Sequence, residues 1–172
     1  FAYSILVDIF NDVPYSEALM GVENLSPVYD DASTIYSSLG TTLDGAITTL
    51  SASTDMGDFA GSDLIYAGST SHWAMLANSL KLRMAMRMAN ITGSDSQAMA
   101  EAAASGVFTS NADHAYIMYQ SSTPNTNPLW EDLVQSGRTD FLASQTMADI
   151  MNNTNDPRRA IYFRNLDANG DL

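Results

Sequence analysis

The chain contains few of the side chains that start covalent chemistry or bind metals. Cysteine is absent, and the two histidines, His72 and His114, stand far apart in the sequence. A metal site needs several clustered ligands, and a catalytic histidine needs an orienting partner, which the sequence places beside neither. Motifs of nucleotide-binding loops, zinc proteases and serine hydrolases are also absent. We therefore expect no catalytic residues, no metal site and no cofactor.

Paired carboxylates are the remaining catalytic possibility, because glycoside hydrolysis needs only two of them. The adjacent pairs are Asp30-Asp31 and Glu131-Asp132. Neighbouring side chains point to different faces of a helix or strand, so neither pair converges on one substrate. Helix capping is the simpler role for the first pair, and solvent exposure for the second. A hydrolase is accordingly the least favoured function.

A short acidic run near the end of the sequence has some features of a calcium loop. Asp167, Asn169 and Asp171 alternate like the first ligands of such a loop. Gly170 falls before the third ligand and the distal Glu is missing, so an Asn-Gly turn is the simpler account. Calcium remains the open alternative at these three residues.

Aromatic residues around one loop have the composition of a sugar-binding site. Tyr119 precedes a loop rich in Asn, Thr and Pro (residues 121–128), and Trp130 follows it beside Glu131. Flat rings can stack on pyranose faces, while nearby amides and charged groups bind hydroxyls. The alternative is that Trp130 anchors the loop onto the core. The candidate ligand-binding residues are Trp130, Tyr119, Asn127 and Arg138.

The charge distribution excludes several partners. The net charge is −13, and residues 1–71 contain ten Asp or Glu residues but no Lys or Arg. Phosphate-rich nucleic acid and anionic lipid would both be repelled by this surface. We expect the acidic first part to pair with the basic residues of the following helix, which include Lys81, Arg83 and Arg87.

Hydrophobic periodicity predicts a helical protein. Ile35, Leu39, Leu43, Ile47 and Leu50 form one apolar stripe over a helix that Asp30 or Asp31 caps. A second long helix is expected over residues 73–91, capped by Ser71, with Trp73, Met84, Met88 and Ile91 on its buried face. The other expected helices cover residues 1–10, 96–105 and 140–151, with one turn at 16–20. Segments 63–66 and 114–119 have extended character.

The order of several motifs resembles a known family. Asn11–Leu19 is similar to a G-D-V-P-Y-x-E-A-L segment, with Asn11 in place of the glycine. Trp73–Arg87 resembles the helix W-x-x-x-A-N-S-L-K-L-R-x-A-x-R. Further matching segments are Pro27–Asp30, Ile35-Tyr36, Leu43–Ile47, Asp63–Tyr66, Asn127–Leu129, Arg138–Phe141 and Asp156–Arg158. Together these motifs resemble the SusD/RagB family of Bacteroidetes outer-membrane nutrient-binding lipoproteins over nearly the whole chain.

The resemblance implies a mostly α fold of tetratricopeptide-like helical hairpins with long irregular loop insertions. It implies that residues 1–172 are a middle fragment of a single SusD-like domain, truncated at both ends, with the lipid-bearing cysteine before Phe1. It further implies a surface-exposed, lipid-anchored outer-membrane protein without catalysis. Such a protein binds glycans and delivers them to a SusC-like TonB-dependent transporter.

A second function class stays open beside glycan binding. Paired amphipathic helices are also typical of repeat modules that bind a protein or peptide. Trp130, Tyr119, Asn127 and Arg138 favour the glycan, whereas a bare helical surface would favour the protein partner.

Overall fold

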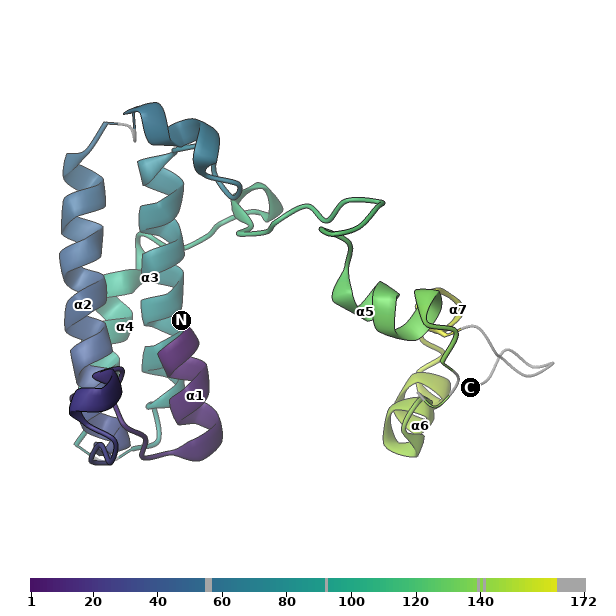
Figure 1. Ribbon diagram of the computed structural model, residues 1–172, viewed down its shortest axis with the longest axis horizontal. Helices are drawn as coiled ribbons and strands as arrows, with labels where there is room; N and C mark the ends of the chain where they lie inside the picture. The colour runs from purple at the N-terminus through teal and green to yellow at the C-terminus, as the bar shows by residue number, and fades with distance from the viewer. Residues whose placement is uncertain (55–56, 92, 139, 141, 164–172) are drawn as a thin grey trace. The chain divides into compact units, whose positions relative to one another are not determined.

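The structure is a computed structural model that describes residues 1–54, 57–91, 93–138, 140 and 142–163. The chain forms two compact units, Phe1–Ile117 and Met118–Leu172 (Figure 1). Helices dominate the described residues of both units, and the one β pairing among these residues is the isolated antiparallel bridge between Val13 and Asp30. The predicted mostly α fold is confirmed.

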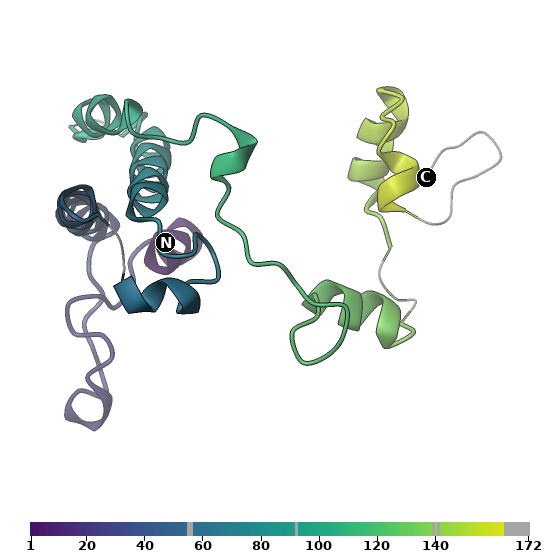
Figure 2. The same ribbon diagram turned by 90° about the horizontal axis from the view of Figure 1, so that it is seen from above.

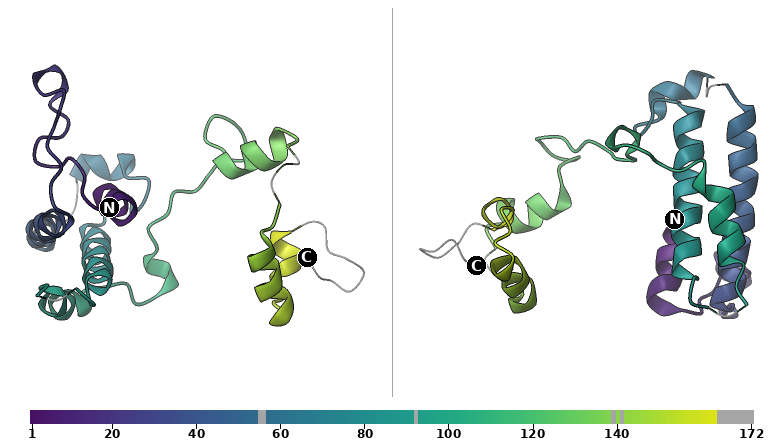
Figure 3. Two further views of the ribbon diagram at one scale, coloured as in Figure 1. Left: turned by 90° about the horizontal axis from the view of Figure 1, so that it is seen from below. Right: turned by 180° about the vertical axis from the view of Figure 1, so that it is seen from behind.

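The described residues of the first unit form four α-helices and three short 3-10 helices. They are α1 (Ala2–Phe10), η1 (Gly21–Glu23), α2 (Ala32–Ala52), η2 (Gly57–Ser62), α3 (Thr70–Arg87), α4 (Ser96–Ala104) and η3 (Asn111–Asp113). Helices α2 and α3 form an antiparallel hairpin, α4 packs along α3, and α1 packs against α2 (Figures 1 and 3). This arrangement is the predicted helical hairpin, with irregular segments inserted before α2 and between α2 and α3.

The core of the first unit lies where α1, α2 and α3 meet. Its fully enclosed side chains are Ile35 from α2 and Met84 from α3. Val7, Val13, Tyr36 and Met88 complete the buried cluster. The predicted α2 stripe therefore faces the core, because Leu39 and Leu43 pack against the same cluster.

The second unit has shorter elements. They are α5 (Pro128–Trp130), a π-helical turn η4 (Glu131–Gln135), α6 (Gln145–Asn153) and α7 (Arg159–Tyr162). Helix α6 begins five residues later than predicted, because the Ser144 side chain accepts a hydrogen bond from the Met147 N–H and caps it there. Neither α5 nor η4 was predicted.

Helix capping confirms one prediction and corrects another. Asp31 caps α2 by accepting hydrogen bonds from the N–H groups of Ser33 and Thr34. The predicted cap Ser71 is wrong for α3, since Ser69 occupies that position and accepts from the His72 N–H. The helix thus begins at Thr70 and ends at Arg87 rather than covering residues 73–91.

The buried face of α3 differs from the predicted one at the two ends of the helix. Met84 and Met88 are buried as predicted. Trp73 is half-buried, and its indole N–H donates to Asp63. Ile91 is exposed, since it lies beyond the end of the helix.

The segments predicted to have extended or single-turn character form turns instead. Residues 63–66 wrap around the Asp63 carboxylate, and residues 16–19 form a turn rather than a helix. Residues 114–119 are irregular and form no strand within the described chain. In each case the weak propensity of the segment for a strand or a helical turn is outweighed, either by local side-chain hydrogen bonds or by the lack of a partner strand.

Ion pairs join the acidic first part to α3, as predicted for two of the three basic residues. The Lys81 ammonium lies 2.5 Å from Asp44, and the Arg87 guanidinium lies 3.0 Å from Asp8. The prediction for Arg83 is not met, because its exposed side chain makes no ion pair with the described acids. Arg158 binds Asp156 within the motif segment Asp156–Arg158.

No helix within the described residues is long and apolar enough to span a bilayer. The same residues contain no group of three or more histidine or acidic side chains placed to bind a metal ion. The candidate calcium residues Asp167, Asn169 and Asp171 lie outside the described part of the chain.

Candidate functional site

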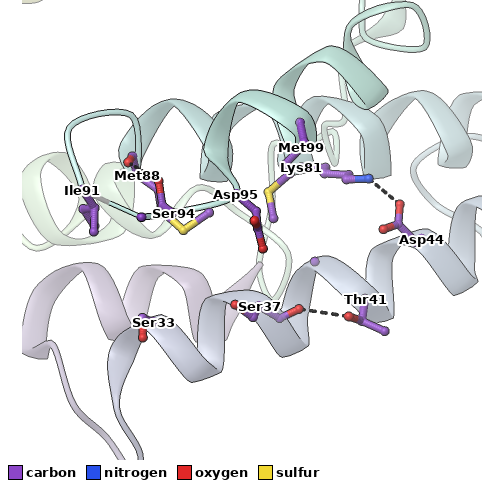
Figure 4. A pocket seen from close by; sticks show the side chains of 13 residues that line it. Ser33, Ser37, Thr41, Asp44, Lys81, Met88, Ile91, Ser94, Asp95 and Met99 are labelled. Atoms are coloured by element: carbon purple, nitrogen blue, oxygen red, sulfur yellow. Dashed lines mark hydrogen bonds and ion pairs between the residues drawn. The ribbon is translucent and has the colours of Figure 1, made fainter.

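A groove of about 560 Å³ runs between α2, the end of α3 and the start of α4 (Figure 4). Ser33, Ser37 and Thr41 supply hydroxyl groups from α2. Their spacing of four residues places them on one face of the helix. Met88 and Met99 line the groove from α3 and α4, so it combines polar and apolar surfaces.

Lys81 and Asp44 form the charged part of the groove (Figure 4). The Lys81 side chain is only 8% exposed, whereas that of Asp44 is 57% exposed. The ammonium is therefore held within the helix layer and neutralised at 2.5 Å by the carboxylate. The groove presents a carboxylate and hydroxyls to an incoming group rather than a free cation.

The shape of the groove depends on a close approach of α4 to α2. A Cβ at Gly40 would lie 2.7 Å from the Cε of Met99. The missing side chain lets the methionine pack directly against the α2 backbone. This contact closes one side of the groove.

The chemistry available in the groove is hydrogen bonding without stacking. None of the described side chains that line it is aromatic. Sugar rings are usually bound through at least one flat apolar ring. The described lining can therefore exchange hydrogen bonds with a ligand but offers no ring for stacking.

A cluster of aromatic residues lies at the N-terminal end of α3. Tyr66 stacks on His72 with ring centroids 5.2 Å apart and meets Trp73 edge to face at 5.4 Å. Its hydroxyl donates to the Asp113 carbonyl, and the Trp73 indole donates to Asp63. Because these polar groups are bonded within the protein, the cluster joins three chain segments and is not an open site.

The Asp63 carboxylate has a strongly lowered pKa. Desolvation raises its pKa, but hydrogen bonds from the Gly68 N–H, the Trp73 indole, and the Ile65 and Tyr66 N–H groups together lower it to about 2. Four donors favour the charged form strongly. Asp63 therefore organises the turn before α3 as an anion at neutral pH.

The four predicted site residues all lie in the second unit. Asn127 caps α5, accepting from the Leu129 N–H at 2.9 Å, and Trp130 ends the same short helix with 42% of its surface exposed. Tyr119 is more than half exposed and precedes the loop, where the Gln120 N–H donates to the Asn125 carbonyl. Arg138 follows η4 and pairs with Asp140 at 2.5 Å. The structure thus brings Asn127 and Trp130 onto one element.

Glu131 corrects the expectation of a solvent-exposed pair at residues 131–132. Its carboxylate accepts a hydrogen bond from the hydroxyl of buried Thr126, and the Glu131 side chain is only half-exposed. This bond fixes the loop against η4, immediately after Trp130. Asp132 is exposed as expected.

The groove residues Ser33, Ser37, Thr41 and Asp44 were missed as a site in the sequence. The signal that could have identified them is a hydroxyl at every fourth position of α2, followed by a carboxylate on the same face. Serine and threonine are common on exposed helix faces, so this pattern gains meaning only when a second helix lies opposite.

Antiparallel helices with inserted irregular segments define the class of the fold as mostly α. The sequence matches the SusD-like family described as "Starch-binding associating with outer membrane" over residues 1–171. The chain therefore belongs to this family. No curated protein sequence matches it.

Solved structures show the same fold. A SusD homologue from Bacteroides uniformis is 30% identical with a TM-score of 0.78, over 99% of this chain and 36% of that protein. A chitin-binding protein is 33% identical with a TM-score of 0.70, covering 90% and 32% of the two chains. A chitin-binding SusD homologue from Flavobacterium johnsoniae is 28% identical with a TM-score of 0.73, covering 90% and 32%. The chain thus spans about one third of the length of these proteins.

Proposed function

We propose that this chain is part of a non-catalytic protein that binds glycans at the outer membrane. The observation that carries the proposal is the family match over residues 1–171, together with two similar structures described as chitin-binding. Because the match runs across both compact units, it supports their belonging to one domain of this family.

We place the glycan contacts at the aromatic loop of the second unit. The exposed ring of Trp130 offers a stacking surface, and Tyr119 offers a second ring. Asn127 uses its Oδ1 to cap α5, which leaves its amide NH₂ to donate to a sugar hydroxyl. Arg138, oriented by Asp140, adds a positive charge near η4.

Delivery and localisation belong to the same proposal. A lipid anchor outside residues 1–172 would hold the protein on the outer-membrane surface, and a SusC-like TonB-dependent transporter would receive the glycan. The family description, which places its members at the outer membrane, supports this assignment.

A glycan array followed by titration of the bound oligosaccharide tests the proposal, with chito-oligosaccharides included. We expect Trp130→Ala to weaken binding by at least about tenfold, because aromatic stacking is lost. Leu129→Ala is the matched control, since Leu129 is an exposed apolar residue of the same helix. Equal affinity of the Trp130 variant and the wild type would contradict the assigned contacts, and turnover of the oligosaccharide would contradict a binding protein.

A polypeptide ligand is the second candidate, favoured by the groove without aromatic lining. Replacing Thr41 with Arg would fill the groove and should abolish peptide binding without changing glycan binding. The reverse result, with glycan binding lost and peptide binding retained, would place the glycan in the groove.

A further inference from the structure

The segment before α2 exposes apolar side chains to an unusual extent. Within residues 16–29, here called the apolar loop, Leu19 is 96%, Val22 90% and Leu25 81% exposed. Met20, Val28 and Tyr29 are also exposed. Isolated exposed apolar residues are normal, but six in one loop of 14 residues form a patch that typically marks an interaction site.

The polar groups of the apolar loop are used internally. Glu17 accepts hydrogen bonds from the Asn24 amide at 2.7 Å and from the Val28 N–H at 3.2 Å. Asn24 accepts in turn from the Ser26 N–H. The loop therefore folds on its carboxylate and amide and leaves its apolar side chains outside, which is the reverse of an ordinary surface loop.

The base of the apolar loop is firmly attached to the first unit. Asp30 accepts from the N–H groups of Tyr15 and Ser16 at 2.9 Å and from the Ser16 hydroxyl at 2.7 Å. The bridge between Val13 and Asp30 closes the loop beside these bonds. The Tyr15 hydroxyl lies 2.9 Å from that of Ser38 on α2. The loop projects from the helices of its unit (Figures 2 and 3).

A loop held in this way loses little conformational entropy when it binds, which favours a specific partner. The charge of its surroundings decides which partner fits. Residues 1–71 carry ten acidic and no basic residues, and Glu23 lies exposed within the loop itself. A second copy of this loop or an anionic lipid surface would be repelled, whereas a basic surface would be attracted.

We propose that the apolar loop is a docking surface for a protein partner that offers an apolar pocket rimmed by Lys or Arg. Leu19, Val22 and Leu25 enter the pocket, and Glu23 pairs with its rim. The surface involves none of the residues assigned to glycan binding, so this inference does not depend on the proposed function.

The test uses the 172-residue chain and a phage library of short cyclic peptides as the probe. The double variant Leu19→Ser/Leu25→Ser removes the apolar side chains, and Leu64→Ser/Leu142→Ser is the matched control at exposed sites outside the loop. Circular dichroism should show unchanged melting for both, because all four side chains face solvent. The selected peptide is synthesised, and its affinity is measured by fluorescence anisotropy at low and high salt.

We expect selected peptides to combine apolar residues with Lys or Arg. Their affinity should fall about tenfold or more in the loop variant, stay unchanged in the control, and weaken severalfold when the salt concentration rises from about 50 to about 300 mM. Failure to select any peptide that requires the loop would overturn the proposal, and so would a selected peptide without basic residues. Loop-dependent dimerisation or binding to phosphatidylglycerol vesicles would assign the surface to a different occupant and overturn it as well.

Discussion

Asp63 connects a short sequence motif to the geometry of the first unit. Its carboxylate accepts three backbone N–H groups and the Trp73 indole N–H, and these bonds hold the chain where it enters α3. The folded-state pKa of about 2 lies below the ordinary value of 3.8. Because the pKa is lower in the folded state, the Asp63 carboxylate stabilises the fold fully above pH 3.8, and this stabilisation is lost as the pH falls toward about 2.

Replacing Asp63 with Asn should lower the melting temperature by several degrees at pH 7, because an amide cannot accept all four hydrogen bonds as a carboxylate does. The difference from the wild type should shrink as the pH falls from 3.8 toward about 2. Thermal denaturation followed by circular dichroism across this range measures both effects. Asp95→Asn is the control, since the Asp95 side chain is exposed and makes no capping bond. A pH-independent difference would contradict the assigned pKa.

Gly40 and Gly45 both lie within α2 but have different neighbours. Their alanine variants therefore separate the effect of helix propensity on stability from the effect of packing. A Cβ at Gly45 would meet nothing within 4 Å beyond the adjoining backbone of its own helix, whereas a Cβ at Gly40 would lie 2.7 Å from the Met99 Cε. Gly45→Ala should raise the free energy of unfolding by about 0.5–1 kcal/mol. Gly40→Ala should give a clearly smaller gain, because the methionine must move. Urea denaturation compares them, and equal gains would show that the α2–α4 contact is loose.

At the scale of the elements, three helices meet at one hydrogen-bonded network. Tyr36 of α2 donates to Asp8 of α1, and Arg87 of α3 pairs with the same carboxylate at 3.0 Å. Desolvation and the bond to Asp8 raise the pKa of Tyr36 to about 12. The neutral phenol is therefore part of the fold below pH 10, and its contribution is lost as the pH rises from 10 toward 12.

Arg87→Met should destabilise this junction by about 1 kcal/mol, because Asp8 loses one partner while the half-exposed arginine is already screened by water. Arg83→Met is the matched control on the same helix and should change the free energy of unfolding by less than about 0.5 kcal/mol. Urea denaturation gives both values. The Arg87 role is structural, so a stable variant with a selective loss of glycan affinity would contradict it.

At the scale of the whole molecule, the two units differ in how much they bury. The first has a continuous apolar cluster that includes Ile35, Tyr36 and Met84. Among the described residues of the second, only Thr126 and Met151 are buried. A small core provides little of the hydrophobic stabilisation that independent folding needs.

A polypeptide of residues 1–117 should therefore retain helical structure and melt cooperatively, whereas residues 118–172 alone should show no cooperative transition. Circular dichroism melting of the two separate polypeptides measures this difference. A cooperative transition in the second polypeptide would show that its few buried side chains suffice.

The sequence determined much of the local structure of this protein. Periodic apolar residues predict α2 and the core face of α3, and the Asp31 cap follows from a side chain that bonds to nearby N–H groups. Charge predicts that the acidic first part pairs with α3, because residues 1–71 contain no Lys or Arg, and among the described residues Lys81 and Arg87 form such pairs whereas Arg83 does not. The ordered motifs also identify the family.

The tertiary structure decided features that depend on distant residues. Ser69 and Ser71 are equally good caps in the sequence, and the turn around Asp63 places Ser69 at the start of α3. The groove exists because Met99 of α4 approaches Gly40 of α2, which are far apart along the chain. Local patterns report bonds between near neighbours, whereas grooves, exposed loops and the choice between two equivalent caps depend on which segments meet after folding.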